Sequence, residues 1–272
     1  MKIGFIGLGD MGAPMVERML HHGLEVVIWA RRPETTRRFD HTAASVAETP
    51  EALGAACDLV GICVQGDTGV REVVVSSGLL SAMRPGTVLA VHSTVLPQTC
   101  SALAELAADV GVSVLDAPIS GGHRGAAEGT LTVMVGGPAE AFERSRAVFE
   151  TFAALVLRLG PVGAGQAAKL VNNTLLSANK KLLFDALTIG EELGIEPTTL
   201  LELLRASTGG SRAIDFIGPD YASPDFLRRT QPLNWKTFDR FVQLAEEAGV
   251  PDSVLERAAE AGLRELDRIA GI

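Results

Sequence analysis

The sequence has few cysteines, no long apolar run and no excess of positive charge, and each absence excludes a class of protein. The three cysteines among 272 residues are an odd number without Cys-x-x-Cys spacing, which predicts reduced packing residues and neither disulfides nor metal ligands. No run approaches the roughly 18 apolar residues that cross a bilayer, and no signal-peptide pattern follows Met1. A formal net charge of -9 opposes broad attraction to nucleic acid or anionic lipid. We therefore expect a cytoplasmic protein that binds neither nucleic acid nor membranes.

The composition that is present, 47% hydrophobic and 21% charged residues, is that of an ordinary globular chain. In the N-terminal part of the chain, short apolar runs alternate with helix-like segments, a pattern that predicts a βαβ sheet with helices on its faces. The expected strands are residues 2–7, 25–30, 58–64, 87–93, 112–118 and 131–137, with 154–160 as one more candidate.

The pattern changes at the Gly160-Pro161-Val162-Gly163 segment, after which no convincing strand follows. Residues 164–193 contain no proline and predict one long helix that ends at Gly194. Further helices are expected at residues 197–207, 234–249 and 251–271. The sequence thus predicts an α/β nucleotide-binding domain at residues 1–161, followed by an all-helical domain at residues 162–272.

A glycine-rich loop directly follows the first expected strand. The segment Gly7-Leu8-Gly9-Asp10-Met11-Gly12 is a G-x-G-x-x-G between that strand and a helix start with Pro14 in its first turn. In such a loop Gly7 permits the tight turn, Gly9 lets the backbone approach a pyrophosphate, and Gly12 lets the helix pack closely on the strand. Unpaired N–H groups at the helix N-terminus then attract the phosphates. We expect this loop to bind the pyrophosphate of a dinucleotide; a plain glycine turn is the alternative, which the βαβ context disfavours.

The end of the second expected strand indicates which dinucleotide is bound. An NAD site would carry a carboxylate there, about 20 residues past the glycine loop, to hold the ribose 2′-hydroxyl. The sequence instead has Arg31 and Arg32, with no acid until Glu34. Because guanidinium groups suit a 2′-phosphate, NADP (NADPH) is favoured over NAD. The alternative is that both arginines belong to a solvated run with Arg37 and Arg38.

A second glycine-rich loop, after the strand at 112–118, carries candidate substrate ligands. It contains Ser120, Gly121 and Gly122, whose hydroxyl and successive backbone N–H groups can converge on an anion. A small carboxylate is the natural guest. A flexible surface loop would explain the glycines, but not their position at the carboxyl end of a strand, where open α/β sheets bind their ligands.

The expected long helix carries a candidate acid/base. Lys169 and Asn173 lie one turn apart on it, and Ser177 continues the same face. A lysine among alanine, leucine and valine neighbours is partly desolvated, which lowers its pKa and suits it to proton transfer near neutral pH. Asn173 can orient the lysine or bind the reacting oxygen. A solvated polar face is the alternative interpretation.

Taken together, these segments resemble the β-hydroxyacid dehydrogenase family, which includes the 3-hydroxyisobutyrate and 6-phosphogluconate dehydrogenases. The similarity covers most of the chain, because three motifs occur in the family's order: the glycine loop with Met15, the DAPISGG segment at 116–122, and G-x-G-x-x-x-K-x-x-x-N at 163–173. The resemblance implies a Rossmann domain followed by an all-α domain that pairs with its twin through the long helix. It therefore implies a homodimer or a higher homo-oligomer.

The resemblance also implies roles for individual residues. Lys169 would be the catalytic acid/base, with Asn173 and Ser120 beside it at the catalytic centre. The substrate carboxylate would be held by Ser120, Gly121 and Gly122, with Asn173 as a further substrate ligand. The implied cofactor contacts are Gly7, Gly9, Met11, Gly12, Arg31, Arg32, Val64, Gln65, Thr94 and Lys236. No metal ligand is implied.

The chain departs from the family in the helix that closes the substrate site. Family members usually have Lys-Asp there, where this chain has Lys236-Thr237, and a phenylalanine upstream, where this chain has Arg229. We expect an NADP-dependent oxidoreductase that transfers hydride between the nicotinamide and a short β-hydroxyacid or its semialdehyde. The altered helix leaves two alternatives: a reductase of another substrate, such as an imine, or a non-catalytic cofactor-sensing protein. His92 and His123 are predicted to be packing or solvated residues.

Overall fold

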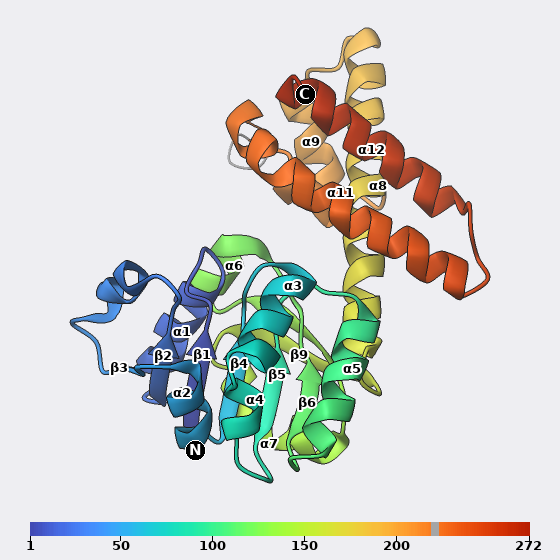
Figure 1. Cartoon of the computed structure of the whole chain (residues 1–272). Helices are drawn as coiled ribbons and strands as arrows, with labels where there is room; N and C mark the ends of the chain where they lie inside the picture. The colour runs from blue at the N-terminus through green and yellow to red at the C-terminus, as the bar shows by residue number, and fades with distance from the viewer. Residues whose placement is uncertain (219–222) are drawn as a thin grey trace. The chain divides into compact units, whose positions relative to one another are not determined.

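The structure is a computed structural model that describes residues 1–218 and 223–272. The chain divides into two compact units, Met1–Lys169 and Leu170–Ile272. The first unit is a sheet with helices, and the second is helical (Figure 1). The long helix α8 (Ala164–Glu192) begins in the first unit and continues into the second.

The sheet of the first unit has nine strands among the described residues, in the order β3-β2-β1-β4-β5-β6-β8-β7, with β9 paired to β8. The strands β1 to β6 pair in parallel, whereas β8 is antiparallel to β6 and β7. The order β3-β2-β1-β4-β5-β6 is that of the Rossmann fold, so the predicted fold class is confirmed. The strands are β1 (Lys2–Ile6), β2 (Glu25–Trp29), β3 (Ser45–Val46), β4 (Leu59–Ile62), β5 (Val88–Val91), β6 (Ser113–Asp116), β7 (Ile119–Ser120), β8 (Leu131–Gly136) and β9 (Ala153–Gly160).

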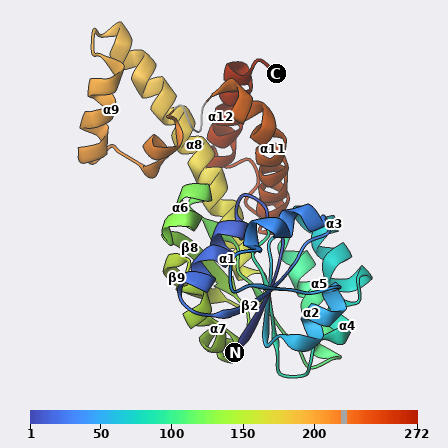
Figure 2. The ribbon, with the colours of Figure 1, turned by 90° about the vertical axis from the view of Figure 1, so that its left-hand side faces the viewer.

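Helices cover both faces of this sheet (Figure 2). One face carries α1 (Gly12–His21), α6 (Gly122–Glu128) and α7 (Ala139–Phe149); the other carries α2 (Pro50–Ala56), α3 (Gly66–Arg71), α4 (Leu79–Ala82) and α5 (Pro97–Ala108). Each face has its own apolar core, with Met15 and Phe149 fully buried in one and Leu53 and Leu79 in the other. Because both faces are covered, the central strands are apolar without alternation, and all four residues of β5 are buried. A 3-10 helix η1 (Pro33–Phe39) follows β2, and a π-helical turn η2 (Glu72–Ser76) follows α3.

The second unit contains the C-terminal part of α8 together with α9 (Pro197–Ala206), the 3-10 helix η3 (Arg212–Phe216), α11 (Pro224–Glu247) and α12 (Val254–Ala270). One side of α8 packs Leu183 against η3 and α9, and Ala178 packs against α11 and α12. The sequence predicts a helix only at residues 234–249. The helix instead begins at Pro224 and contains Pro232 in its interior. Within residues 1–218 and 223–272, no helix combines the length and the apolar character needed to cross a bilayer.

Candidate active site

In the loop after β1, glycine stands at each of three positions for a different structural reason. Gly7 has a φ of 104°, in the left-handed region, and a Cβ there would overlap the carbonyl of Cys63. A Cβ on Gly12 would overlap the carbonyl oxygen of Gly7, so the packing of α1 on β1 itself requires this glycine. A Cβ on Gly9 would meet nothing within 4 Å. The protein has no internal need for glycine at residue 9, and the open space there fits the close approach of a phosphate group.

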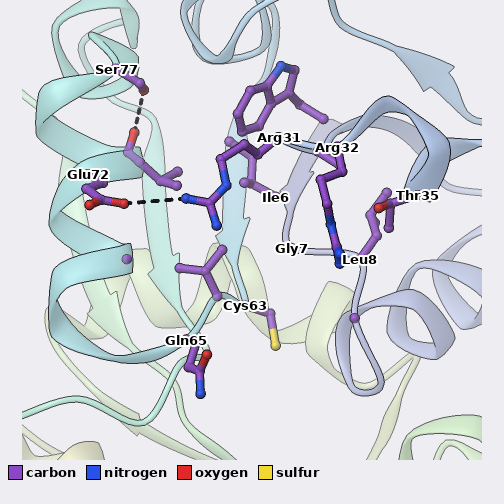
Figure 3. A pocket seen from close by; sticks show the side chains of 16 residues that line it. Ile6, Gly7, Leu8, Arg31, Arg32, Thr35, Cys63, Gln65, Glu72 and Ser77 are labelled. Atoms are coloured by element: carbon purple, nitrogen blue, oxygen red, sulfur yellow. Dashed lines mark hydrogen bonds and ion pairs between the residues drawn. The ribbon is translucent and has the colours of Figure 1, made fainter.

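A cavity of about 660 Å³ adjoins this loop (Figure 3). It lies at the carboxyl ends of β1, β2 and β4, where the strand order reverses, which is where doubly wound folds bind dinucleotides. The part of its wall that the sequence predicted comprises Gly7, Gly9, Arg31, Arg32, Val64 and Gln65. The part that it missed includes Gly69, Glu72, Val73 and Ser77, on α3, on η2 and just after it. These four residues belong to no motif, so only the fold brings them to the cavity.

The two arginines predicted to read the 2′-phosphate both line the cavity, but they point in different directions (Figure 3). The Arg31 guanidinium reaches across toward Glu72, with Nη1 3.7 Å from the carboxylate Oε2. Arg32 lies near Thr35 and is 4.0 Å from Glu34. The Arg31 side chain is 85% exposed, and ion pairs this exposed contribute little stability. Both guanidinium groups are therefore accessible to an anionic ligand in the cavity.

The remaining predicted cofactor contacts lie in different places. The backbone N–H of Val64 donates to Ser93 Oγ at 2.8 Å, which ties the end of β4 to the loop after β5. Thr94, the next residue in that loop, and Met11, the residue before α1, are not among the described residues that line the cavity. Lys236 lies on α11, in the second unit.

The N-terminus of α8 is held by the buried carboxylate of Asp116, the last residue of β6. Its two oxygens accept hydrogen bonds from the backbone N–H groups of Gly163 at 2.7 Å and Gln166 at 2.8 Å. Burial raises the pKa of Asp116, although these N–H groups favour its charged form. A Cβ on Gly165 would overlap the carbonyl oxygen of Met134, on β8. The two glycines of the G-x-G-x-x-x-K motif thus allow the helix to start in direct contact with the sheet.

A second clamp on the same helix comes from Gln166, which is completely buried. Its Nε2 donates to the carbonyl oxygen of Ser93 at 2.8 Å, and its Oε1 accepts from the N–H of Val95 at 3.1 Å. The segment after β5 and the end of β6 therefore both determine where α8 begins. Three residues later, α8 carries Lys169.

Lys169 has the environment that the sequence predicts for an acid/base. Its exposure is only 8%, and burial lowers its pKa to about 8. A lysine with this pKa exchanges its proton readily near neutral pH. One turn further along α8, Asn173 is half-buried, and its Oδ1 accepts from Asn172 Nδ2 at 3.3 Å.

The loop after β7 carries the predicted carboxylate ligands. Ser120 ends β7 and pairs with Thr132 of β8. Gly121 and Gly122 follow with φ values of 133° and 68°, which only glycine adopts easily, and they turn the chain into α6. The Nδ1 of His123 donates to the carbonyl oxygen of Asp10 at 2.7 Å. His123 thus links this loop to the dinucleotide loop.

His92 is a core residue. Its ring stacks on Phe5 and makes edge contacts with Phe149 and Phe152, and its Nδ1 donates to the carbonyl oxygen of Ala117 at 2.8 Å. Burial lowers the pKa of His92 to about 4, so the ring is neutral at physiological pH. This environment indicates a packing role.

The two departures on α11 have local explanations. The hydroxyl of Thr237, at the position of the family's aspartate, donates to the carbonyl oxygen of Leu233 at 2.9 Å within the helix. The guanidinium of Arg229, at the expected position of an aromatic residue, lies 5.7 Å from the ring centre of Phe226. An aromatic ring is therefore present on this helix three residues before the expected position.

Comparison with known proteins identifies the family. Residues 2–160 match the model of the NAD binding domain of 6-phosphogluconate dehydrogenase, and residues 163–267 match the NAD-binding model of NADP-dependent 3-hydroxyisobutyrate dehydrogenase. The 2-(hydroxymethyl)glutarate dehydrogenase of Eubacterium barkeri is 37% identical over 216 residues, which are 79% of this chain and 71% of that protein. The NAD-dependent L-serine dehydrogenase of Pseudomonas aeruginosa is 36% identical over 219 residues, 80% of this chain and 74% of that protein.

The fold gives the same result. The structure of 3-hydroxyisobutyrate dehydrogenase from Mycobacterium tuberculosis with L-serine superposes with a TM-score of 0.83 at 28% identity, over 98% of this chain and 94% of that one. The chain therefore belongs to the β-hydroxyacid dehydrogenase family, an oxidoreductase family whose members here are NAD(P)-dependent hydroxyacid dehydrogenases.

Proposed function

We propose that the protein is an NADP-dependent dehydrogenase that transfers hydride between the nicotinamide and a short β-hydroxyacid or its semialdehyde. The observation that carries this proposal is Lys169: a buried amine, with a pKa lowered to about 8, on a helix clamped to the carboxyl ends of the Rossmann strands. A merely solvated lysine on a polar helix face would have neither the burial nor the lowered pKa.

The cofactor would be held by residues whose geometry fits it. The open space at Gly9 suits a pyrophosphate, with Gly7, Met11 and Gly12 forming the rest of the loop. The 2′-phosphate would be held by Arg31 and Arg32. Further contacts would come from Val64 and Gln65, which line the cavity, and from Thr94 and Lys236. When bound, the nicotinamide supplies or accepts the hydride.

The substrate carboxylate would accept hydrogen bonds from the Ser120 hydroxyl and the Gly121 and Gly122 backbone. Asn173 would bind the oxygen at the reacting carbon. Lys169 would protonate that oxygen as hydride arrives, or remove the hydroxyl proton in the reverse direction. Asp116 and Gln166 would act on the reaction only by fixing the start of α8.

We assign residues 162–272 to substrate closure and dimerisation. Four large apolar side chains on the second-unit part of α8 are between 45% and 60% exposed, and their spacing puts them on one face of the helix: Val171, Leu175, Leu182 and Ile189. A symmetric homodimer through this face would bury them. Light scattering at micromolar concentration should give twice the mass of the chain, and a monomer mass would contradict the assignment.

The direct test of the proposed activity is a substrate panel with both cofactors. It should contain 3-hydroxyisobutyrate, glycerate, tartronate semialdehyde, succinic semialdehyde and a cyclic imine. We expect turnover of at least one hydroxyacid or semialdehyde with NADP(H), at higher kcat/KM than with NAD(H). Turnover of the imine alone, or NADPH binding without turnover of any compound, would refute the proposal.

A further inference from the structure

The two glycine-rich loops of the first unit are joined by one side chain, that of His123. The dinucleotide loop, residues 7–12, leads into α1, and the substrate loop, residues 120–122, leads into α6. These two helices pack beside each other on one face of the sheet (Figure 2). Both loops and both helices belong to one compact unit, so the structure fixes how the loops lie relative to each other.

The helices α1 and α6 contact each other at both of their ends. At their starts, the His123 ring bonds the carbonyl oxygen of Asp10, 113 positions away in the sequence, at 2.7 Å. At the other end, a Cβ on Gly129 would come within 2.8 Å of the guanidinium of Arg18, in the last turn of α1. Arg18 is itself held, because its Nε donates to the carbonyl oxygen of Thr151 at 3.2 Å. The helices therefore run in the same direction, with their two starts side by side.

The His123 ring supplies a side-chain bond where neither helix has a capping side chain. The residues that precede the helices, Met11 before α1 and Gly121 before α6, make no side-chain cap. A carbonyl oxygen only accepts hydrogen bonds, so Nδ1 of His123 carries a proton and donates it to Asp10. The ring is exposed, so a substitution at residue 123 leaves the apolar core unchanged.

The substrate loop needs such a bond because its backbone is otherwise free to change conformation. Gly121 and Gly122 both have positive φ values, and glycine moves between such conformations and others at little cost. Their backbone N–H groups converge on an anion only in some of these conformations. His123 follows directly, and its bond to Asp10 restricts the backbone that the two glycines can adopt.

We propose that His123 is a positioning residue that couples cofactor binding to substrate binding. A pyrophosphate bound by the N–H groups of the dinucleotide loop orders that loop, and the bond between His123 and Asp10 transmits this order to the substrate loop. By linkage, each ligand then raises the affinity for the other by the same factor. This inference rests on the proposed function, which assigns the cofactor and the substrate carboxylate to these two loops.

The test uses two substitutions that differ only in where they place an amide. In His123→Asn the amide nitrogen takes the position of Nδ1, so the bond to Asp10 is kept. In His123→Gln the amide nitrogen lies one bond further out, at the position of Nε2, so the bond is lost. The control is Glu128→Gln, which removes an exposed ion pair with Arg124 on the same helix.

Calorimetry measures the dissociation constants of 3-hydroxyisobutyrate and of glycerate, each with and without saturating NADPH. A hydroxyacid and NADPH are both reduced, so their ternary complex does not react. In wild type, NADPH should tighten the binding of at least one hydroxyacid. In His123→Gln this enhancement should fall by about twofold to tenfold, the value of one neutral hydrogen bond. His123→Asn and Glu128→Gln should keep the enhancement of wild type.

Four results would overturn the proposal. They are a wild type in which NADPH does not tighten hydroxyacid binding, a wild type that binds neither hydroxyacid with NADPH present, an enhancement that His123→Gln leaves unchanged, and a loss in His123→Gln that is equal with and without NADPH, which indicates a purely structural role. Urea unfolding identifies a misfolded His123→Gln, which His123→Ala then replaces. Failure of the proposed function is distinguishable, because it shows as absence of turnover in a protein whose coupled binding is intact.

Discussion

The dinucleotide loop of the first unit and a small polar cavity in the second, which Ser177 and Lys180 help to line, are built in different ways. The loop is shaped by backbone: Gly7 and Gly12 are required because carbonyl groups occupy the space that a side chain would need. The cavity is shaped by side chains from three helices, and its charged group, Lys180, forms no ion pair with any residue that the structure describes. A backbone-built site tolerates little change, whereas a side-chain-built site can be altered while the fold is kept.

The largest effect should come from placing a methyl group in the backbone-built loop. Gly12→Ala puts a Cβ against the Gly7 carbonyl, and overpacking against rigid backbone should lower the free energy of unfolding by about 3 kcal/mol or more. Gly9→Ala meets no atom within 4 Å and should change it by less than about 0.5 kcal/mol, while weakening NADPH binding. Urea unfolding measures the stability of each variant, and titration with NADPH measures its cofactor binding.

A matched change in the second unit sharpens this comparison. Ser177→Ala removes only a hydroxyl bonded within its own helix, so it should cost less than about 1 kcal/mol. If Ser177→Ala destabilises the protein as much as Gly12→Ala does, the distinction between the two kinds of site fails.

The sequence was sufficient for the backbone-built site and insufficient for the side-chain-built one. The glycine spacing at residues 7–12 and the Lys169–Asn173 spacing are local patterns; the first predicted the loop, and the second singled out a lysine that the structure shows to be buried, whose role as acid/base stays a prediction. No local sequence pattern marks Glu72 or Lys180. Each residue lines a cavity only because the tertiary fold brings distant segments together around it. Asp116 lay inside a motif, but its role at the start of α8 joins residues distant in sequence, so no local pattern reveals it. The start of α11 was placed ten residues too late: the helix begins at Pro224 and contains Pro232 in its interior.

The next largest effect should come from Arg31 and Arg32, which line the cavity beside the glycine loop. Arg31→Ala should weaken NADPH binding by about tenfold to a hundredfold, the value of a hydrogen bond to a charged group, and leave NADH binding almost unchanged. Arg38→Ala is the control, because that guanidinium pairs with Glu17 and does not line the cavity. Dissociation constants for both cofactors are needed for Arg31→Ala, Arg32→Ala and the double variant. A wild type that prefers NADH, or an equal loss of both cofactors in the double variant, would show that NADP is the wrong assignment.

The rates of reduction and of oxidation should change with pH in opposite directions. Reduction needs protonated Lys169, so kcat/KM should fall by up to about tenfold per pH unit above the pKa of about 8. Oxidation needs the neutral amine, so its rate should rise with pH and level off above about 8. Initial rates between pH 6 and pH 10 test this. Profiles that run in the same direction for both reactions would exclude Lys169 as the titrating group.

The smallest effect should come from Glu72, which competes with a phosphate for Arg31. Glu72→Gln removes an exposed ion pair worth about 0 to 1 kcal/mol, so NADPH binding should tighten by no more than about fivefold. NADH binding, which does not use Arg31, should be unaffected. Weaker NADPH binding in this variant would mean that Glu72 supports the cofactor and does not oppose it.

The most direct test of the central claim is single-turnover kinetics of Lys169→Ala with saturating cofactor. If Lys169 moves the proton, the hydride-transfer rate should fall by at least about a hundredfold, the usual scale of acid/base catalysis, while the dissociation constant for NADPH stays within about twofold of wild type. A urea unfolding transition like that of wild type should show that the variant is folded. A hydride-transfer rate equal to that of wild type, in a folded variant that binds NADPH, would contradict the claim.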